Sequence, residues 1–208
     1  FGVDPTGPVG GSLLANLIQN PSLLERVNQG REVGYIIIIV GLFGIGVALW
    51  KLFTLYNMGK AVKKQAKSKS HDQNNPLGRV LAVGEEHMGK DIETLELKLA
   101  EAIMAERPAI ERGIPVVKII SVVAPLAGLL GTVTGMIVTF QQITLFGTGD
   151  PKIMAGGISQ ALVTTVLGLV VAIPTTLLHS FANSSARGII NVLEEQSTGI
   201  VAEHSDSN

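Results

Sequence analysis

Hydroxyl and amide side chains are concentrated in two uncharged apolar stretches of the sequence, Ile119 to Ile143 and Ala155 to Phe181. Such groups donate and accept hydrogen bonds, so together they could solvate an ion or a titratable side chain. Helices in lipid bury polar groups against something polar, because hydrocarbon offers no hydrogen bonds. The two stretches therefore predict a polar cavity or a polar helix interface. The threonines and glutamines concerned are Thr132, Thr134, Thr139, Gln141, Gln142, Gln160, Thr164, Thr165, Thr175 and Thr176, with Thr144 directly after the first stretch.

Carboxylates are missing from the same two stretches. Between Arg112 and Glu194 the only carboxylate is Asp150, which lies in the short link between the stretches. A protein that moves protons through a membrane normally carries an ionisable residue within it. This chain is therefore not predicted to be a self-sufficient carboxylate proton relay. It could instead form the wall of a cavity whose titratable group arrives on another polypeptide.

Small residues recur at helical spacing in both stretches. Helices in a bilayer associate through close packing and hydrogen bonds, and small residues let their backbones approach. Such stripes are also typical of simple packing seams, in which threonines bond the carbonyls of their own helix. Both interpretations, a seam and a polar cavity wall, remain open. The first stripe is Gly128, Thr132, Gly135 and Thr139, beside a Gly131–Gly135 pair, and the second is Ala161, Thr165, Gly168, Ala172 and Thr176.

Composition favours a membrane protein without catalytic chemistry. The chain has 208 residues, of which 46% are hydrophobic and 16% charged, and its mean hydropathy is +0.40. The basic residues between Lys60 and Lys69 have no aromatic residues among them, which argues against nucleic-acid binding. No cysteine is present and the four histidines are scattered, so we predict no metal, no cofactor and no enzyme activity.

The hydropathy pattern predicts an all-α membrane protein with three transmembrane helices and long cytoplasmic helical extensions. Eleven of the sixteen lysines and arginines lie between Lys51 and Arg112, which places that segment in the cytoplasm. The N-terminus is then periplasmic and the C-terminus cytoplasmic. The expected segments are 1–32, periplasmic or interfacial and amphipathic; 33–56, transmembrane; 57–113, cytoplasmic; 114–146, transmembrane; 147–154, periplasmic turn; 155–181, transmembrane; and 182–208, cytoplasmic tail.

The cytoplasmic segment predicts one amphipathic helix over 85–114. Its apolar residues recur at three- and four-residue steps, which requires a partner surface. We expect the second and third spans to project below the membrane and pack with it. Pro108 and Pro115 are expected to bend this column rather than end it. The apolar positions are Met88, Ile92, Leu95, Leu99 and Ile103.

Two segments of the sequence resemble a known family. LAGLLGTVTGMIVTF and GDPKIMAGGISQALVTTVLGLVVAIP are similar to the two core helices of the MotA/TolQ/ExbB proton-channel family, and nearest to its ExbB branch. The resemblance covers roughly 51–182. It implies a homo-pentamer in the bacterial inner membrane, surrounded by lipid, with the second and third spans around a central pore. An ExbD-like single-span subunit would supply the titratable aspartate, and TonB would receive the motion. The start at Phe1 fits a long-form ExbB-like subunit that has lost an outer domain.

The resemblance also assigns roles to residues. Thr132 and Thr165 match the family's pore-facing threonines, and Pro125 and Pro174 match its helix prolines. Gln160 stands where the family usually has a glutamate, and an amide cannot titrate. A TolQ-like or other stator role and a non-conducting scaffold for a partner helix remain as alternatives, as does sodium instead of protons. The predicted pore-lining set is Thr132, Thr165, Gln160, Thr164 and Thr139, and the predicted packing and kink set is Gly128, Gly131, Gly135, Gly168, Pro125 and Pro174.

Overall fold

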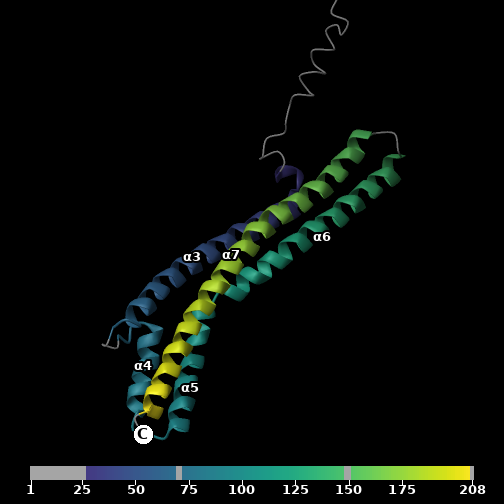
Figure 1. The fold of residues 1–208 in the computed structure, drawn as a ribbon. Coiled ribbons are helices and arrows are strands. Elements are labelled where there is room, and N and C mark those ends of the chain that lie inside the picture. Colours follow the sequence, from purple (N-terminus) through teal and green to yellow (C-terminus); the bar gives the residue numbers. More distant parts are fainter. Residues whose placement is uncertain (1–26, 69–71, 148–150, 207–208) are drawn as a thin grey trace, which may run out of the picture. The chain divides into compact units, whose positions relative to one another are not determined.

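The computed structural model describes residues 27–68, 72–147 and 151–206, and these ranges consist of helices joined by short turns (Figure 1). This confirms the prediction of an all-α protein. Most of the amphipathic segment predicted over 1–32 lies outside the described residues. The helices are α3 (Arg31–Gln65), α4 (Pro76–His87), α5 (Ile92–Glu111), α6 (Ile114–Phe146) and α7 (Pro151–Asp206).

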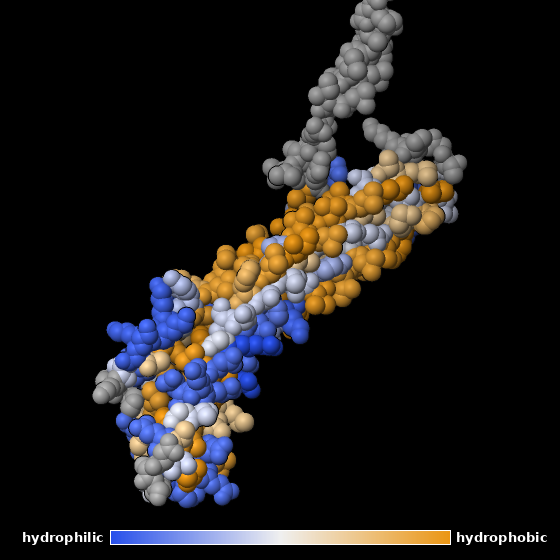
Figure 2. Space-filling model, in the orientation of Figure 1, coloured by the Kyte–Doolittle hydropathy of each residue, from blue (hydrophilic) through white to orange (hydrophobic). Residues whose placement is uncertain are grey.

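Three of these helices, α3, α6 and α7, are long and apolar enough to cross a membrane. This confirms the number of spans that the hydropathy pattern predicted. A span needs about 20 residues at 1.5 Å rise, and the three helices exceed that length. Figure 2 shows apolar residues over much of their surface and hydrophilic residues around α4 and α5. The segment 182–208, predicted as a tail, continues α7 without a break as far as Asp206.

The contacts divide the chain into two units. Unit one contains the start of α3 up to Ile38 and the α6–α7 hairpin from Leu126 to Leu169. Unit two contains residues 39–125 and the rest of α7 from Val170. In unit two, α4 and α5 pack with the later part of α7 around a core of buried aliphatic side chains that includes Leu77, Leu95 and Leu193.

The prediction of a single helix over 85–114 is wrong at two places. α4 ends at His87, and α5 begins at Ile92. Asp91 is the N-cap of α5, because its side chain accepts a hydrogen bond from the Thr94 backbone N–H at 2.9 Å. That bond, followed by the one from the Thr94 hydroxyl, lowers the pKa of Asp91. Of the predicted apolar positions, Leu95 and Leu99 are buried, whereas Met88 and Ile92, which flank the break, are exposed.

The second break separates α5 from α6. α5 ends at Glu111, and Gly113 has a φ of 88°, a left-handed conformation that favours glycine and stops the helix. The expectation that the column bends without ending is therefore wrong. Pro115 fits at the start of α6, where its missing N–H removes no helical bond. The buried Lys51 of α3 donates to the Ala109 carbonyl near the end of α5 at 3.2 Å.

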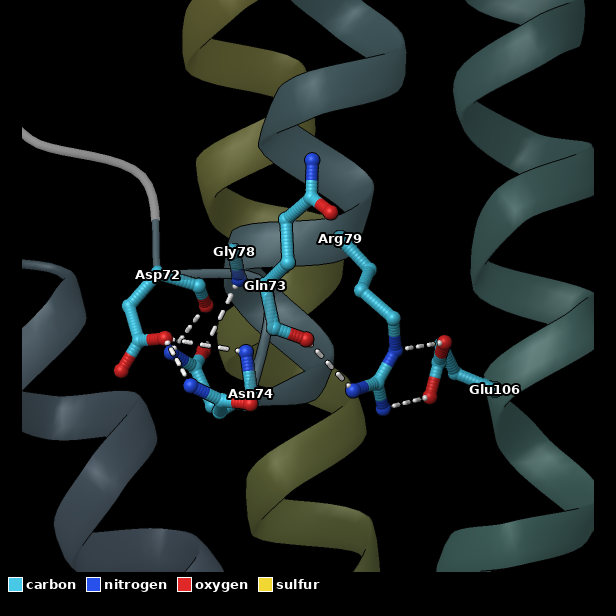
Figure 3. Close-up of polar contacts among 7 residues, drawn as sticks. Asp72, Gln73, Asn74, Gly78, Arg79 and Glu106 are labelled. Carbon is cyan, nitrogen blue, oxygen red and sulfur yellow. Dashed lines mark hydrogen bonds and ion pairs between the residues drawn. The ribbon is translucent and has the colours of Figure 1, made fainter.

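A polar network fixes the chain where it enters α4. The composition of residues 63–76, rich in lysine, serine and asparagine, predicts a flexible turn there. Asn75 caps α4 by accepting from the Gly78 N–H at 2.8 Å, and it donates to the Asp72 carbonyl at 2.7 Å. Arg79 then binds both carboxylate oxygens of Glu106 on α5, each at 2.7 Å (Figure 3). The Glu106 side chain raises the pKa of Arg79 further above its ordinary value.

Candidate functional site

A seam of small residues joins α6 to α7 in unit one. A Cβ atom on Gly128 would lie 2.9 Å from the Thr164 carbonyl oxygen and 3.4 Å from the Gly168 Cα. A Cβ atom on Gly135 would lie 2.9 Å from the Gly157 carbonyl oxygen. Since these distances leave no room for a side chain, the glycines allow direct contact between the two backbones.

Gly157 is the seam residue that sequence reasoning missed. It lies one helical turn before Ala161, the first residue of the predicted stripe, and it packs against the Thr139 hydroxyl. The sequence did contain an indication of its role, because Gly157 is a small residue four positions before Ala161 and so continues the stripe. On α6, the seam follows Gly128, Gly131, Gly135 and Thr139. Thr132 of the predicted stripe is only partly buried, so Gly131 occupies the seam position in its place.

Two of the predicted pore-lining threonines lie inside this seam. Thr139 is 3% exposed and Thr164 is fully buried within a single chain. Thr139 donates to the Gly135 carbonyl at 3.0 Å, and Thr164 donates to the carbonyls of Ala161 and Gln160. Their hydroxyls are thus satisfied by their own helices. A role for them in a pore stays a prediction.

The two other predicted threonines, Thr132 and Thr165, are partly exposed. Thr132 donates to the Leu129 carbonyl at 2.6 Å, and Thr165 reaches the Ala161 carbonyl only at 3.4 Å. A hydroxyl that donates to its own helix still has lone pairs with which it can accept a hydrogen bond. These two side chains can therefore offer acceptors to a group outside the chain.

Gln160 lines a pocket of about 530 Å³ at the end of unit one where α6 ends and α7 begins. Its side chain is 8% exposed. Gln142, Arg31 and Gln29 also line the pocket, and Ser159 donates to the Gln29 side chain at 3.0 Å. The pocket can hold polar groups by hydrogen bonds, but Gln160 itself cannot exchange a proton at ordinary pH.

Pro125 and Pro174 lie inside α6 and α7 and do not end either helix. Both belong to unit two. A proline has no N–H and removes the helical hydrogen bond to the carbonyl four residues earlier. The carbonyls of Ser121 and Val170 are consequently left without that bond and can accept from another donor.

The described residues contain no group of three histidine, cysteine or acidic side chains that could hold a metal ion. The sequence of α6 from Ile119 onward carries no aspartate, glutamate, lysine or arginine, and neither does that of α7 from Ile153 to Ala186. The chemistry available there is hydrogen bonding by hydroxyls, amides and free carbonyls. These sections can therefore solvate a titratable group that carries a proton, although they contain no acidic or basic side chain of their own.

These features define a multi-pass helical membrane protein in which two helices, α6 and α7, carry hydroxyls within long uncharged sections. Comparison with known proteins identifies it further. The chain belongs to the MotA/TolQ/ExbB proton channel family, which matches residues 72–195. The matched region includes α4, α5, α6 and most of α7, and it leaves α3 outside.

Individual relatives carry ExbB names. The chain is 28% identical over 189 residues to an ExbB homolog of Methanothermobacter thermautotrophicus, with 83% of this chain and 67% of the relative covered. It is 45% identical over 89 residues to an ExbB-like protein of Synechocystis, covering 42% of this chain and 41% of the relative. It is 48% identical over 58 residues to the biopolymer transport protein ExbB of Aquifex aeolicus, covering 28% and 39%.

Proposed function

We propose that this chain is a stator and proton-channel subunit of the bacterial inner membrane. With an ExbD-like single-span subunit, it uses the protonmotive force to energise TonB-dependent uptake across the outer membrane. The observation that carries the proposal is the absence of any carboxylate in the membrane part of a proton-channel family member. Proton transfer needs a group that can both take and release a proton. A partner helix therefore supplies that group.

The partly exposed threonines are the groups that meet the partner in this proposal. Thr132 and Thr165 donate to their own helices and are partly exposed, so their oxygens can still accept a hydrogen bond from another group. Acceptors favour the protonated form of a carboxyl, because that form has a hydrogen to donate. The threonines thus stabilise the neutral carboxyl while it lies in the membrane. Gln160, Thr164 and Thr139 form the polar layer behind them.

Assembly follows from the same proposal. Five copies surround a central pore, with α6 and α7 facing it, and the partner helix lies inside. The excess of lysine and arginine between Lys51 and Arg112 supports a cytoplasmic position for α4 and α5. The N-terminus is then periplasmic and the C-terminus cytoplasmic. The exposed apolar residues of α3, such as Leu42 and Phe53, face lipid.

The proposal is tested by replacing the threonine hydroxyls with methyl groups. The chain is co-reconstituted with an ExbD-like single-span subunit, and proton entry into vesicles is followed with a pH-sensitive dye. Thr132→Val and Thr165→Val should each reduce the flux, while Thr175→Val should not. Thr175 is a matched control, since it is buried in α7 and bonded to the Val171 and Ala172 carbonyls. Unchanged flux in both test variants contradicts the pore-facing role.

A second candidate is a non-conducting scaffold for the partner helix. The buried seam favours it, because Thr139 and Thr164 have their hydroxyls satisfied and need no pore. In a scaffold the threonine variants are silent, whereas Gly131→Leu disrupts assembly. A TolQ-like role gives the same fluxes as the first proposal and differs only in the periplasmic partner recovered with the complex.

A further inference from the structure

A charged groove of about 580 Å³ lies in unit two, between the end of α5, the start of α6 and the later part of α7. α7 lines it with His179, Asn183, Arg187 and Asn191. Residues four apart lie on the same face of a helix, one turn below another. α6 contributes Lys118 from its second turn. The groove is thus lined by a regular polar stripe and a facing lysine.

The acidic and basic side chains of this groove differ in whether they have a partner of opposite charge. Arg107 pairs with Glu111 at 3.5 Å, and Arg107 also lines a neighbouring small cavity with Glu194. Glu194 lies seven residues after Arg187, or about 10 Å along the helix. The acids of the groove thus have Arg107 close to them, while Lys118 and Arg187 form no ion pair or side-chain hydrogen bond with any other described residue.

Lys118 and Arg187 both stand at the border of the apolar sections. Lys118 is the last charged residue of α6, and Arg187 is the first charged residue of α7 after Lys152. The border between uncharged and charged helix marks the level of lipid headgroups. Exposed apolar side chains continue from there into the uncharged sections, for example Val122 at 55% and Ile173 at 62% exposed.

We propose that this end of the groove binds the phosphate of an anionic phospholipid headgroup. Lys118 and Arg187 supply the positive charge, and His179 and Asn183 supply hydrogen bonds. A guanidinium binds phosphate oxygens in pairs, and basic pockets between membrane helices are suited to anionic headgroups. An anionic lipid fits better than a zwitterionic one, because a choline or ethanolamine cation would bring a third positive charge to the two already present. The acyl chains then lie along the exposed apolar side chains of α6 and α7.

The test uses the full chain purified with its associated subunits. Phosphatidylglycerol, phosphatidylcholine and inorganic phosphate are added separately, and bound lipid is counted by native mass spectrometry. Lys118→Gln/Arg187→Gln removes both groove cations. Lys64→Gln/Lys67→Gln removes the same charge from two exposed positions, one in the last turn of α3 and one just after it, and serves as the control. We expect phosphatidylglycerol to bind in preference to phosphatidylcholine, and the groove variant to lose roughly tenfold or more in affinity. The control should bind like the unaltered protein.

Three outcomes overturn the proposal. Equal binding of phosphatidylglycerol by the two double variants means that the groove is not the site. Displacement of the lipid by inorganic phosphate at equal concentration identifies a free-phosphate site instead. Loss of an associated subunit with unchanged lipid binding shows that the groove holds an acidic protein segment. Arg187→Lys keeps the positive charge and should retain lipid binding. If the double variant has a lowered melting temperature, this conservative variant shows whether lost binding comes from the lost charge or from unfolding.

Discussion

Gly131 of α6 lies directly against the side chain of Thr164 of α7. A Cβ atom on Gly131 would stand 2.8 Å from the Thr164 Cγ2 atom and even closer to its hydroxyl. Thr164 cannot turn away freely, because its hydroxyl is bonded to the Ala161 and Gln160 carbonyls and its side chain is fully buried. The contact therefore fixes how closely α6 and α7 approach in unit one. It also explains why a helix in lipid carries so many glycines.

Gly131→Ala should destabilise the protein although alanine is the better helix former. Overpacking a tight contact costs about 1–3 kcal/mol, which exceeds the gain of up to about 1 kcal/mol from helix propensity. Gly156→Ala on α7 is the matched control, because a Cβ atom there meets nothing within 4 Å. Denaturation midpoints in detergent should fall for Gly131→Ala and stay level or rise for the control. A midpoint that is equal in both variants would show that the seam is loose.

Thr164→Val and Thr132→Val should have opposite profiles. Thr164 is buried in the seam, so loss of its hydroxyl bonds should cost about 1 kcal/mol of stability. Thr132 is partly exposed, so its change should leave stability nearly unaltered and reduce proton flux. Melting and vesicle flux are measured on both variants. If both variants changed stability and proton flux in the same way, the distinction between buried seam threonines and partly exposed threonines would not correspond to a difference in function.

Arg79 and Glu106 should show a measurable coupling energy between α4 and α5. Both nitrogen–oxygen distances are 2.7 Å, and the Glu106 side chain is only 15% exposed. Because Arg79 is 44% exposed, solvent screens the pair, and we expect about 1 kcal/mol or less. A double-mutant cycle with Arg79→Gln and Glu106→Gln measures it. The coupling should fall as salt is raised. The exposed Lys98–Glu101 pair, measured in the same way, should couple less strongly.

Much of the fold could be predicted from the sequence because long uncharged runs leave few alternatives to a membrane helix. The seam was harder to predict. Thr132 and Gly131 both fit a stripe with Gly128 and Gly135, and only the position of α7 decides which one is buried. The breaks at His87 and Gly113 depend on single caps and turns, which a hydrophobic period of three to four residues does not register.

The network around Asn75 shows the same limit. Its polar residues read as a turn in the sequence, because partners such as Glu106 lie far along the chain and become neighbours only after α4 and α5 pack. Gln160 could be recognised as a neutral substitute in its motif. The pocket that it lines could not be predicted, because α3, α6 and α7 each contribute to the lining.

Asp91 should make the stability of α5 depend on pH. The hydrogen bonds from Thr94 lower the pKa of the folded carboxyl below its ordinary value. A group whose pKa is lowered by folding stabilises the protein above the unfolded pKa of about 3.9. That stabilisation is lost as the pH falls through the folded pKa. Asp91→Ala should therefore lower the melting temperature at neutral pH, and the difference from the unaltered protein should shrink below about pH 4.

Asp91→Asn separates the charge from the cap. Asparagine is as good an N-cap as aspartate and cannot titrate, so this variant should keep most of the stability at neutral pH. Its difference from Asp91→Ala should stay constant as the pH falls. Hydrogen exchange at the Thr94 amide, the donor to Asp91, reports the same bond locally. If exchange at that amide were equally slow in all three proteins at every pH, the cap would not be what starts α5.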